Sequence, residues 1–379
     1  MSTVNPLEHI SHLVQDLLDS ERSTPVRPTL DPEDAERMFG LAIPKDGSSA
    51  DEIVGRLREV VLATPTTSGP RFYNQLFGGR EPVATLAEML TAAMNISMYT
   101  YKVAGVQVLI ERVLLEHMAN LAGLSGGDGL FTPGGSMSNM AAMIIARNEA
   151  DASVRNHGMT GGRRVVYTSA EAHYSVRKNA GMIGLGRENV RKVPVDAAGR
   201  MIPKELERMA RLDRDGGSLP VMVIATAGTT VMGAFDPIGP IAGIAGQHGL
   251  WLHVDGAYGG SALLSGQSAP LLAGLDRADS FAWDAHKAMG VPLTCSVLLT
   301  RKPGLMTRHF DESATYLFQQ DSDSLNPGTR SLQCGRRNDA LKLWALWQHL
   351  GDAGFARRTD RQLALASHVR GVVQRDPML

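Results

Sequence analysis

Two short stretches decide the fold of this sequence: LWLHVDGAYGG at residues 250–260 and SFAWDAHK at residues 280–287. Each stretch begins as an apolar, β-prone run and ends on charged side chains, Asp255 in the first and His286-Lys287 in the second. Short apolar runs that stop at a charged residue are typical of buried strands whose carboxyl ends border a site. The two stretches therefore predict neighbouring strands that carry an acid and a lysine to one edge of a sheet.

The same pattern continues outward along the chain. Further β-prone runs lie at residues 164–168, 190–195, 221–226 and 295–299, with helical windows at 136–148, 203–212 and 239–248 between several of them. Strands that alternate with helices predict an α/β fold, a mostly parallel sheet flanked by helices. Residues 50–62 and 82–122 also have helical patterns, and residues 5–20 predict an amphipathic helix that leads into a proline-rich arm.

The composition excludes several classes of function. The 379 residues are 43% hydrophobic and 20% charged, and a formal net charge of -1 gives no electrostatic case for binding nucleic acid or a membrane surface. No apolar run approaches the roughly 18 residues of a membrane-spanning helix. Residues 1–20 have no signal-peptide pattern, so we expect a cytoplasmic protein. Cys295 and Cys334 lack metal-ligand spacing and are expected to be reduced thiols, and no metal site is predicted.

A glycine-rich segment precedes one of the helical windows. Residues 131–139 read FTPGGSMSN and run directly into apolar helical sequence. Glycines and small hydroxyl residues at the start of a helix expose backbone N–H groups at the positive end of the helix dipole, which is an arrangement that binds phosphate. A plain turn with a capping residue is the alternative, because Gly-Gly-Ser turns are common.

Four polar side chains follow predicted strands: His173, Thr230, Asp255 and Lys287. An imidazole can stack on a flat heteroaromatic ring, and a threonine hydroxyl can bind a phenolic oxygen. An aspartate that pairs with a protonated pyridine nitrogen keeps the ring an electron sink, and a desolvated lysine can form a Schiff base. Taken singly, each residue has a structural alternative: a core histidine, a turn threonine, a capping or ion-paired aspartate, a surface lysine. Together with the glycine-rich segment they predict a site for pyridoxal 5'-phosphate.

The chain resembles the group II pyridoxal-phosphate-dependent amino-acid decarboxylases of fold type I, in particular the glutamate and cysteine-sulfinate decarboxylase branch. The resemblance extends from about residue 65 to residue 350. It is carried by ordered segments at residues 71–76, 98–101, 131–135, 171–175, 227–237, 253–255, 286–287, 316–319 and 333–336.

The resemblance implies a role for each matching position. Lys287 binds the cofactor covalently, Asp255 pairs with the pyridine nitrogen, and His173 stacks on the ring. The other implied cofactor contacts are Ala257 beside the ring, Thr230 near the phenolic oxygen, and Ser136, Met137 and His286 at the phosphate.

The resemblance also implies residues that act on the substrate. Gln75 lies in the segment that contacts substrate in the family. Tyr316 matches the mobile-loop tyrosine that returns a proton to the substrate α-carbon, with His173 as the other candidate donor. A homodimer is implied as well, because the cofactor site of this fold lies at a subunit interface.

The expected organisation has three parts: an N-terminal helical arm and dimerisation segment at residues 1–65, a large cofactor-binding domain at 66–335, and the start of a truncated C-terminal small domain at 336–379. The sequence departs from its relatives at Asp284-Ala285, where they commonly have Asn-Pro, and at Lys102 and Gly105, which replace an acid and a proline near the substrate entrance.

The function expected is α-decarboxylation of a small acidic L-amino acid, with glutamate, aspartate and cysteine sulfinate all open. One alternative is a truncated, non-catalytic dimer partner or remnant. Another is a decarboxylase of a basic or aromatic amino acid, which the sequence leaves open because Lys102 only weakly disfavours a basic substrate.

Overall fold

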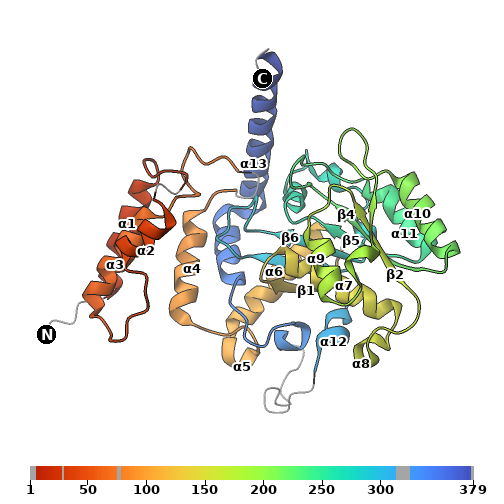
Figure 1. Ribbon diagram of the computed structural model, residues 1–379, viewed down its shortest axis with the longest axis horizontal. Helices are drawn as coiled ribbons and strands as arrows, with labels where there is room; N and C mark the ends of the chain where they lie inside the picture. Colours follow the sequence, from red (N-terminus) through yellow and green to blue (C-terminus); the bar gives the residue numbers. More distant parts are fainter. Residues whose placement is uncertain (1–5, 28–29, 75–77, 313–324, 377–379) are drawn as a thin grey trace. The chain divides into compact units, whose positions relative to one another are not determined.

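The computed structural model describes residues 6–27, 30–74, 78–312 and 325–376 (Figure 1). The chain divides into two compact units, Met1–Gly79 and Arg80–Leu379. The domain boundaries expected from the sequence, after residues 65 and 335, stay predictions.

The described residues of the first unit form three helices: α1 Pro6–Ser20, α2 Pro32–Phe39 and α3 Ala50–Ala63. The start of α3 is fixed by a capping box in which the Ser49 side chain accepts from Glu52 N–H and the Glu52 carboxylate accepts from Ser49 N–H. An ion pair between Arg58 and Asp16, with a closest approach of 3.0 Å, joins α3 to α1. No described residue of α2 or α3 is buried, so this unit has little core of its own.

The second unit is built around a seven-stranded sheet in the order β1-β7-β6-β5-β4-β2-β3. The strands are β1 Asp128–Thr132, β2 Arg164–Ser169, β3 Val190–Val193, β4 Leu219–Thr226, β5 Trp251–Asp255, β6 Ser280–Asp284 and β7 Ser296–Thr300. Strands β3, β2, β4, β5 and β6 are parallel, and β7 runs antiparallel to β6 and β1. The mostly parallel α/β sheet predicted from the sequence is confirmed.

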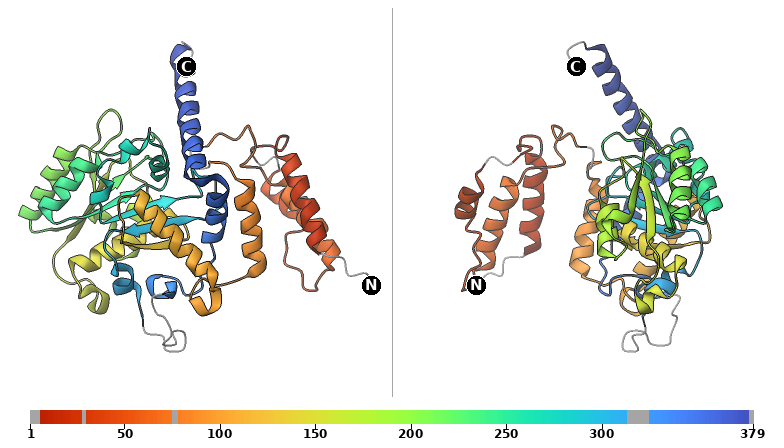
Figure 2. Two further views of the ribbon diagram at one scale, coloured as in Figure 1. Left: turned by 180° about the vertical axis from the view of Figure 1, so that it is seen from behind. Right: turned by 45° about the vertical axis from the view of Figure 1, so that its right-hand side comes forward.

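Helices cover both faces of this sheet (Figure 2). One face packs on α7 Gly135–Ala150, α9 Ser175–Met182 and α12 Leu305–Phe310. The other packs on α6 Val106–Leu121, α10 Pro203–Asp215, α11 Ile238–His248 and α13 Ala340–Arg375, beside α4 Pro82–Met94. Short helices α5 Tyr101–Ala104 and α8 Val154–His157 connect these elements.

The side chains of the inner strands alternate between the two cores. Val166 and Ile224 belong to the core under α7, whereas Val165, Tyr167 and Val223 belong to the core on the opposite face. Because both faces are covered, the strands have continuous apolar sequences instead of an apolar-polar alternation.

The register of the sheet brings several strand ends to one edge. Thr226 at the end of β4 pairs with Asp255 at the end of β5, and Asp255 pairs with Ala282 of β6. Strand β6 then ends at Asp284, three residues before Lys287. The acid and the lysine predicted to meet at one sheet edge are therefore delivered by adjacent strands.

One expected helical stretch is interrupted, and one long helix contains a break. The helical pattern at residues 82–122 is broken after α4, at Asn95 with a φ of 47°, and before α6, at Gly105 with a φ of 52°. Left-handed backbone ends a helix, and glycine and asparagine adopt it most readily. Helix α13 has non-helical backbone at Gly351, with a φ of 60°. Within the described residues, no helix is long and apolar enough to cross a membrane.

Candidate cofactor site

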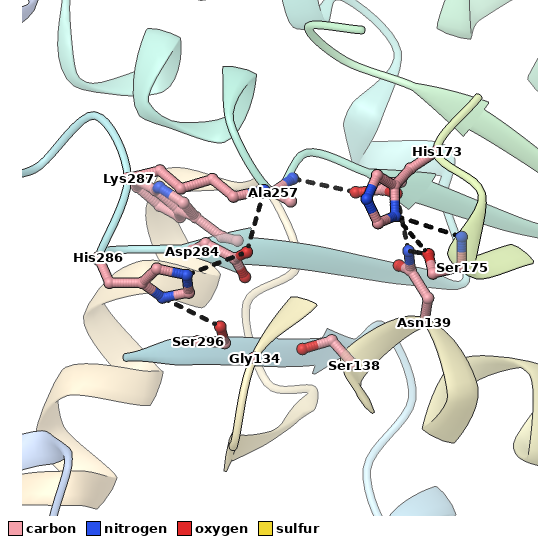
Figure 3. Close-up of polar contacts among 12 residues, drawn as sticks. Gly134, Ser138, Asn139, His173, Ser175, Ala257, Asp284, His286, Lys287 and Ser296 are labelled. Atoms are coloured by element: carbon pink, nitrogen blue, oxygen red, sulfur yellow. Dashed lines mark hydrogen bonds and ion pairs between the residues drawn. The ribbon is translucent and has the colours of Figure 1, made fainter. Parts of the chain in front are cut away.

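Lys287 lies in the turn that follows β6, beside a buried carboxylate. Its Nζ is 3.3 Å from Oδ2 of Asp284, whose side chain is almost completely buried. The other carboxylate oxygen of Asp284, Oδ1, is buried and has no hydrogen-bond partner among the described residues. Figure 3 shows Lys287, Asp284 and His286 grouped together at this end of the strand. The lysine is thus held by a carboxylate that retains unused hydrogen-bonding capacity.

The start of α7 lies against the same carboxylate. Gly134 caps the helix with a φ of 117°, and no side chain caps its first N–H groups. A Cβ built on Gly135 would lie 2.6 Å from Oδ2 of Asp284, so only glycine permits this approach. An uncapped helix start next to a lysine is an arrangement that binds an anionic group.

His286 is fixed by the neighbouring strand. Its Nδ1 lies 3.0 Å from the carbonyl oxygen of Cys295 and 3.1 Å from the backbone nitrogen of Cys295, and Ser296 Oγ is 3.4 Å away. Its Nε2 lies 3.7 Å from Oδ2 of Asp284. The ring is therefore oriented by β7 and presents its other nitrogen to the carboxylate beside Lys287.

Asp255 is buried at the end of β5 and accepts two hydrogen bonds. The backbone N–H of Ala257 donates to Oδ1 at 3.1 Å, and the side-chain amide of Asn139 donates to Oδ2 at 2.7 Å. Each carboxylate oxygen has a second lone pair, so the group can accept a further proton donor such as a protonated pyridine nitrogen. The carbonyl of Ala257 accepts from the N–H of Asp284 at 3.2 Å, which ties the ends of β5 and β6 together.

His173 follows β2 and lies on the opposite side of Ala257 from Lys287 in Figure 3. Its Nδ1 lies 2.8 Å from Ser175 Oγ, and the backbone N–H of Ser175 also donates to Nδ1 at 3.3 Å. Burial lowers the pKa of His173, and the charge of Lys287 adds to this effect, while Asp255 and Asp284 oppose it. The ring is therefore neutral at neutral pH.

A second histidine lies behind Asp255. His253 is fully buried, with Nε2 2.9 Å from Asn139 Oδ1 and Nδ1 2.8 Å from Ser280 Oγ. Burial lowers its pKa to about 4, against the opposing charge of Asp255. A neutral His253 thus forms part of the support for the carboxylate.

These residues fit the demands of pyridoxal phosphate. The cofactor needs a lysine for covalent attachment, an acid for its pyridine nitrogen and donors for its phosphate. Lys287, Asp255 and the uncapped start of α7 supply these three groups along one edge of the sheet. Among the described residues there is no cluster of three or more histidine, cysteine or acidic side chains that could hold a metal ion.

Other predicted residues lie at the same edge. Ser136 and Met137 form the first turn of α7, and the Asn179 side chain donates to the carbonyl of Ser136 at 2.8 Å. Thr230 lies in the loop after β4, where the neighbouring Thr229 hydroxyl accepts from Ala234 N–H at 3.0 Å. Gln75 and Tyr316 fall outside the described residues.

Sequence reasoning missed the residues that support the site, above all Asn139, Ser175, His253 and Ser280. One signal was available for His253: it lies two residues before Asp255 on the same strand, so both side chains point to the same face. No comparable signal links Asn139 to Asp255, because 116 positions separate them in the chain.

Comparison with known proteins places this site in a family. Residues 32–378 match the model of the pyridoxal-dependent decarboxylase conserved domain. The cysteine sulfinic acid decarboxylase of Mus musculus is 44% identical over 344 residues, which cover 89% of this chain and 70% of that protein. The acidic amino acid decarboxylase GADL1 of Bos taurus is 42% identical over 343 residues, covering 89% and 66%. The crystal structure of mouse CSAD superposes with a TM-score of 0.91 at 40% identity, covering 98% of this chain and 81% of the other.

Proposed function

Because this chain belongs to the pyridoxal-dependent decarboxylase family, we propose that it removes the α-carboxylate of a small acidic L-amino acid, releasing the amine and carbon dioxide. Glutamate, aspartate and cysteine sulfinate are the candidate substrates. The substrate class is supported by the names of the similar proteins, a cysteine sulfinic acid decarboxylase and an acidic amino acid decarboxylase.

The observation that carries the proposal is the placement of Lys287 and Asp255 at the ends of adjacent parallel strands. A lysine that binds the cofactor and an acid that holds its ring nitrogen must lie on one side of the sheet to act on one molecule. The parallel pairing of β5 with β6, which has no register shift, produces this arrangement.

Each residue of the site has a separate proposed role toward the cofactor. When bound, pyridoxal phosphate supplies the electron sink for the bond to the departing carboxylate. Lys287 would bind the cofactor covalently and would release the product amine. Asp255 holds the proton on the pyridine nitrogen, and Ala257 packs beside the ring. His173 would stack on the ring and orient it.

The remaining residues are proposed to bind the phosphate and the phenolic oxygen of the cofactor. Ser136, Met137 and the other N–H groups at the start of α7 bind the phosphate, with His286 beside them, and Thr230 binds the phenolic oxygen. The uncapped helix start and the fixed orientation of His286 support these roles.

Proton return to the substrate α-carbon is assigned to Tyr316 or His173, and Gln75 contacts the substrate. The roles of Tyr316 and Gln75 are supported by the resemblance of their sequence segments to the family. For His173, the donation of Ser175 to Nδ1 leaves Nε2 to carry the proton of the neutral ring.

We further propose that the protein is a cytoplasmic homodimer. Exposed apolar side chains on α4 and α6, including Leu86, Leu90, Val106 and Val113, supply a surface for association.

The experiment that tests the function is a panel assay. Purified protein loaded with pyridoxal phosphate is given acidic, basic and aromatic amino acids, and release of carbon dioxide is measured for each. We expect the acidic substrates to give the highest kcat/KM, and Lys287→Ala to abolish turnover. Preference for a basic or aromatic amino acid would overturn the substrate class. Failure of the wild-type protein to bind cofactor or to release carbon dioxide would favour a non-catalytic partner.

A further inference from the structure

A continuous chain of buried hydrogen bonds runs from Asp255 into the interior of the sheet. It passes from Asp255 through Asn139 and His253 to Ser280, and ends at the indole of Trp251, which donates to Ser280 Oγ at 2.8 Å. Asn139, His253 and Ser280 are all buried. A buried polar group that lacks a partner is costly, so the direction of every proton in this chain is constrained.

The two ends of this series of hydrogen bonds, Trp251 and Asp255, fix which group donates and which accepts in each bond. The indole N–H of Trp251 can only donate, so Ser280 Oγ accepts and its own proton is free to go to Nδ1 of His253. At the other end, the Asp255 carboxylate can only accept, so the NH₂ group of Asn139 must face it and Oδ1 of Asn139 must face Nε2 of His253. His253 therefore carries its proton on Nε2.

The reverse arrangement is excluded by the same contacts. A flipped Asn139 would set its carbonyl oxygen against Oδ2 of Asp255, two acceptors at a separation of 2.7 Å. It would also set its NH₂ group against the Nε2–H of His253. The reverse direction requires a protonated Asp255, which would lack the negative charge that pairs with a pyridinium nitrogen.

A second series of hydrogen bonds starts at Asn139 and leads to His173. The same Nδ2 also donates to Ser175 Oγ at 3.3 Å, so Ser175 uses its own proton toward Nδ1 of His173 at 2.8 Å. The backbone N–H of Ser175 points to the same nitrogen. Nδ1 of His173 is thus an acceptor, and the proton of the neutral ring lies on Nε2.

We propose that Asn139 is a positioning residue that couples the two ring-binding groups, keeping Asp255 an ionised acceptor while it holds His173 in the Nε2–H tautomer. This inference rests on the proposed function, because it takes Asp255 and His173 as the groups that hold the cofactor ring. Asn139 itself acts only through these two side chains and through His253.

Two substitutions separate hydrogen-bond polarity from shape. Asn139→Asp is nearly isosteric but replaces the donor group with a second acceptor facing Asp255. Asn139→Leu keeps the branched shape and removes both donor and acceptor. Asn148→Leu is the control, because Asn148 is also buried on the same helix and, among the described residues, its side chain accepts hydrogen bonds from Arg147 and forms none with the site.

The readouts are the ring-nitrogen shifts of labelled histidine in the full chain, recorded with and without pyridoxal phosphate, and the Kd for pyridoxal phosphate. In the wild-type protein and in Asn148→Leu, we expect His173 and His253 each to be a single Nε2–H tautomer. In Asn139→Leu we expect mixed tautomers at both rings, whereas in Asn139→Asp we expect them at His173 alone, because the new carboxylate still accepts from Nε2 of His253. In both variants we expect a Kd at least about tenfold higher, an effect of about 1.4 kcal/mol.

The outcomes distinguish this inference from the proposed function. Wild-type tautomers in both Asn139 variants would overturn the coupling role, even if the enzyme decarboxylates an acidic amino acid. An unaltered Kd in Asn139→Asp would do the same, because a residue that only fills space tolerates this change. Failure of the wild-type protein to decarboxylate any amino acid would overturn the function, while the tautomers measured without cofactor would still decide the role of Asn139.

Discussion

Oδ2 of Asp284 lies 3.3 Å from Nζ of Lys287, so the proposed cofactor lysine is paired with a carboxylate that is only 1% exposed. The same carboxylate packs against Gly135 at the start of α7, where the cofactor phosphate is proposed to bind. Cofactor binding must therefore replace the ion pair of Lys287 and bring a phosphate towards a buried acid. The contact places a cost on cofactor binding that a neutral side chain would not impose.

Asp284→Asn is therefore expected to tighten cofactor binding. The amide keeps the shape of the side chain but removes both the repulsion of the phosphate and the ion pair that binding breaks. We expect the Kd for pyridoxal phosphate to fall roughly fivefold, a change of about 1 kcal/mol. Fluorescence titration measures it. Glu207→Gln on the exposed face of α10 makes the same charge change away from the site. A higher Kd in Asp284→Asn, with no change in Glu207→Gln, would show that the acid helps to hold the cofactor.

Gly135→Ala is expected to disrupt the start of α7. The added methyl group would lie 2.6 Å from Oδ2 and 3.0 Å from Oδ1 of Asp284, so either the helix or the strand end must move. We expect a lower melting temperature and a Kd for inorganic phosphate raised about tenfold, since the donors of the helix start lose their alignment. Gly246→Ala on α11 is the matched control, because nothing lies within 4 Å of its added methyl group. That helix should gain up to about 1 kcal/mol from alanine. Equal effects of the two substitutions would contradict the proposed crowding at Gly135.

The sequence predicted Asp255 and Lys287 because each follows an apolar run, and a parallel sheet gathers such ends at one edge. It could not predict that Asn139 holds Asp255, because that contact depends on how α7 crosses the sheet. The break at Gly105 was also missed, since apolar spacing continues through residues 82–122 while the backbone of a single glycine turns left-handed. The position of the Asp284 carboxylate could not be predicted from the sequence either, because it depends on the close approach of Gly135.

Stability is expected to fall in mild acid because of His253. Burial lowers its pKa in the folded state to about 4, whereas the imidazole of an unfolded chain has a pKa of about 6.5. Between pH 6.5 and pH 4 this histidine is protonated in the unfolded state but not in the folded state. The free energy of unfolding therefore decreases as the pH is lowered through this range. The slope from this group is about 1.4 kcal/mol per pH unit.

Urea unfolding of the wild-type protein and of His253→Gln between pH 7.5 and pH 4 measures this slope. Glutamine cannot take up the proton, so the variant should have lower stability at pH 7 but a flatter pH dependence. His368→Gln, at an exposed position of α13, controls for the loss of one imidazole. Parallel curves for the wild-type protein and His253→Gln would show that another group governs acid sensitivity.

The buried pair Glu111–Arg336 is expected to be a sensitive ionic contact outside the site. Nη2 of Arg336 donates to both carboxylate oxygens of Glu111, at 2.9 Å and 3.0 Å, and Nη1 donates to the carbonyl of Met98 at 3.1 Å. Both side chains are almost fully buried, so this contact joins α6 to the segment before α13. Removing one partner leaves a charge without compensation in the interior.

Arg336→Met and Glu111→Leu should therefore each lower the free energy of unfolding by about 3–5 kcal/mol. The double variant should lose less than the sum of the two, because apolar side chains then replace both charges. Denaturant unfolding gives the coupling energy of the cycle. The exposed pair Glu207–Arg211, at 3.2 Å, provides the comparison and should contribute no more than about 1 kcal/mol. Additive losses at Glu111 and Arg336 would mean that the ion pair does not stabilise the fold and that each side chain acts through its other contacts, such as the hydrogen bond from Arg336 to Met98.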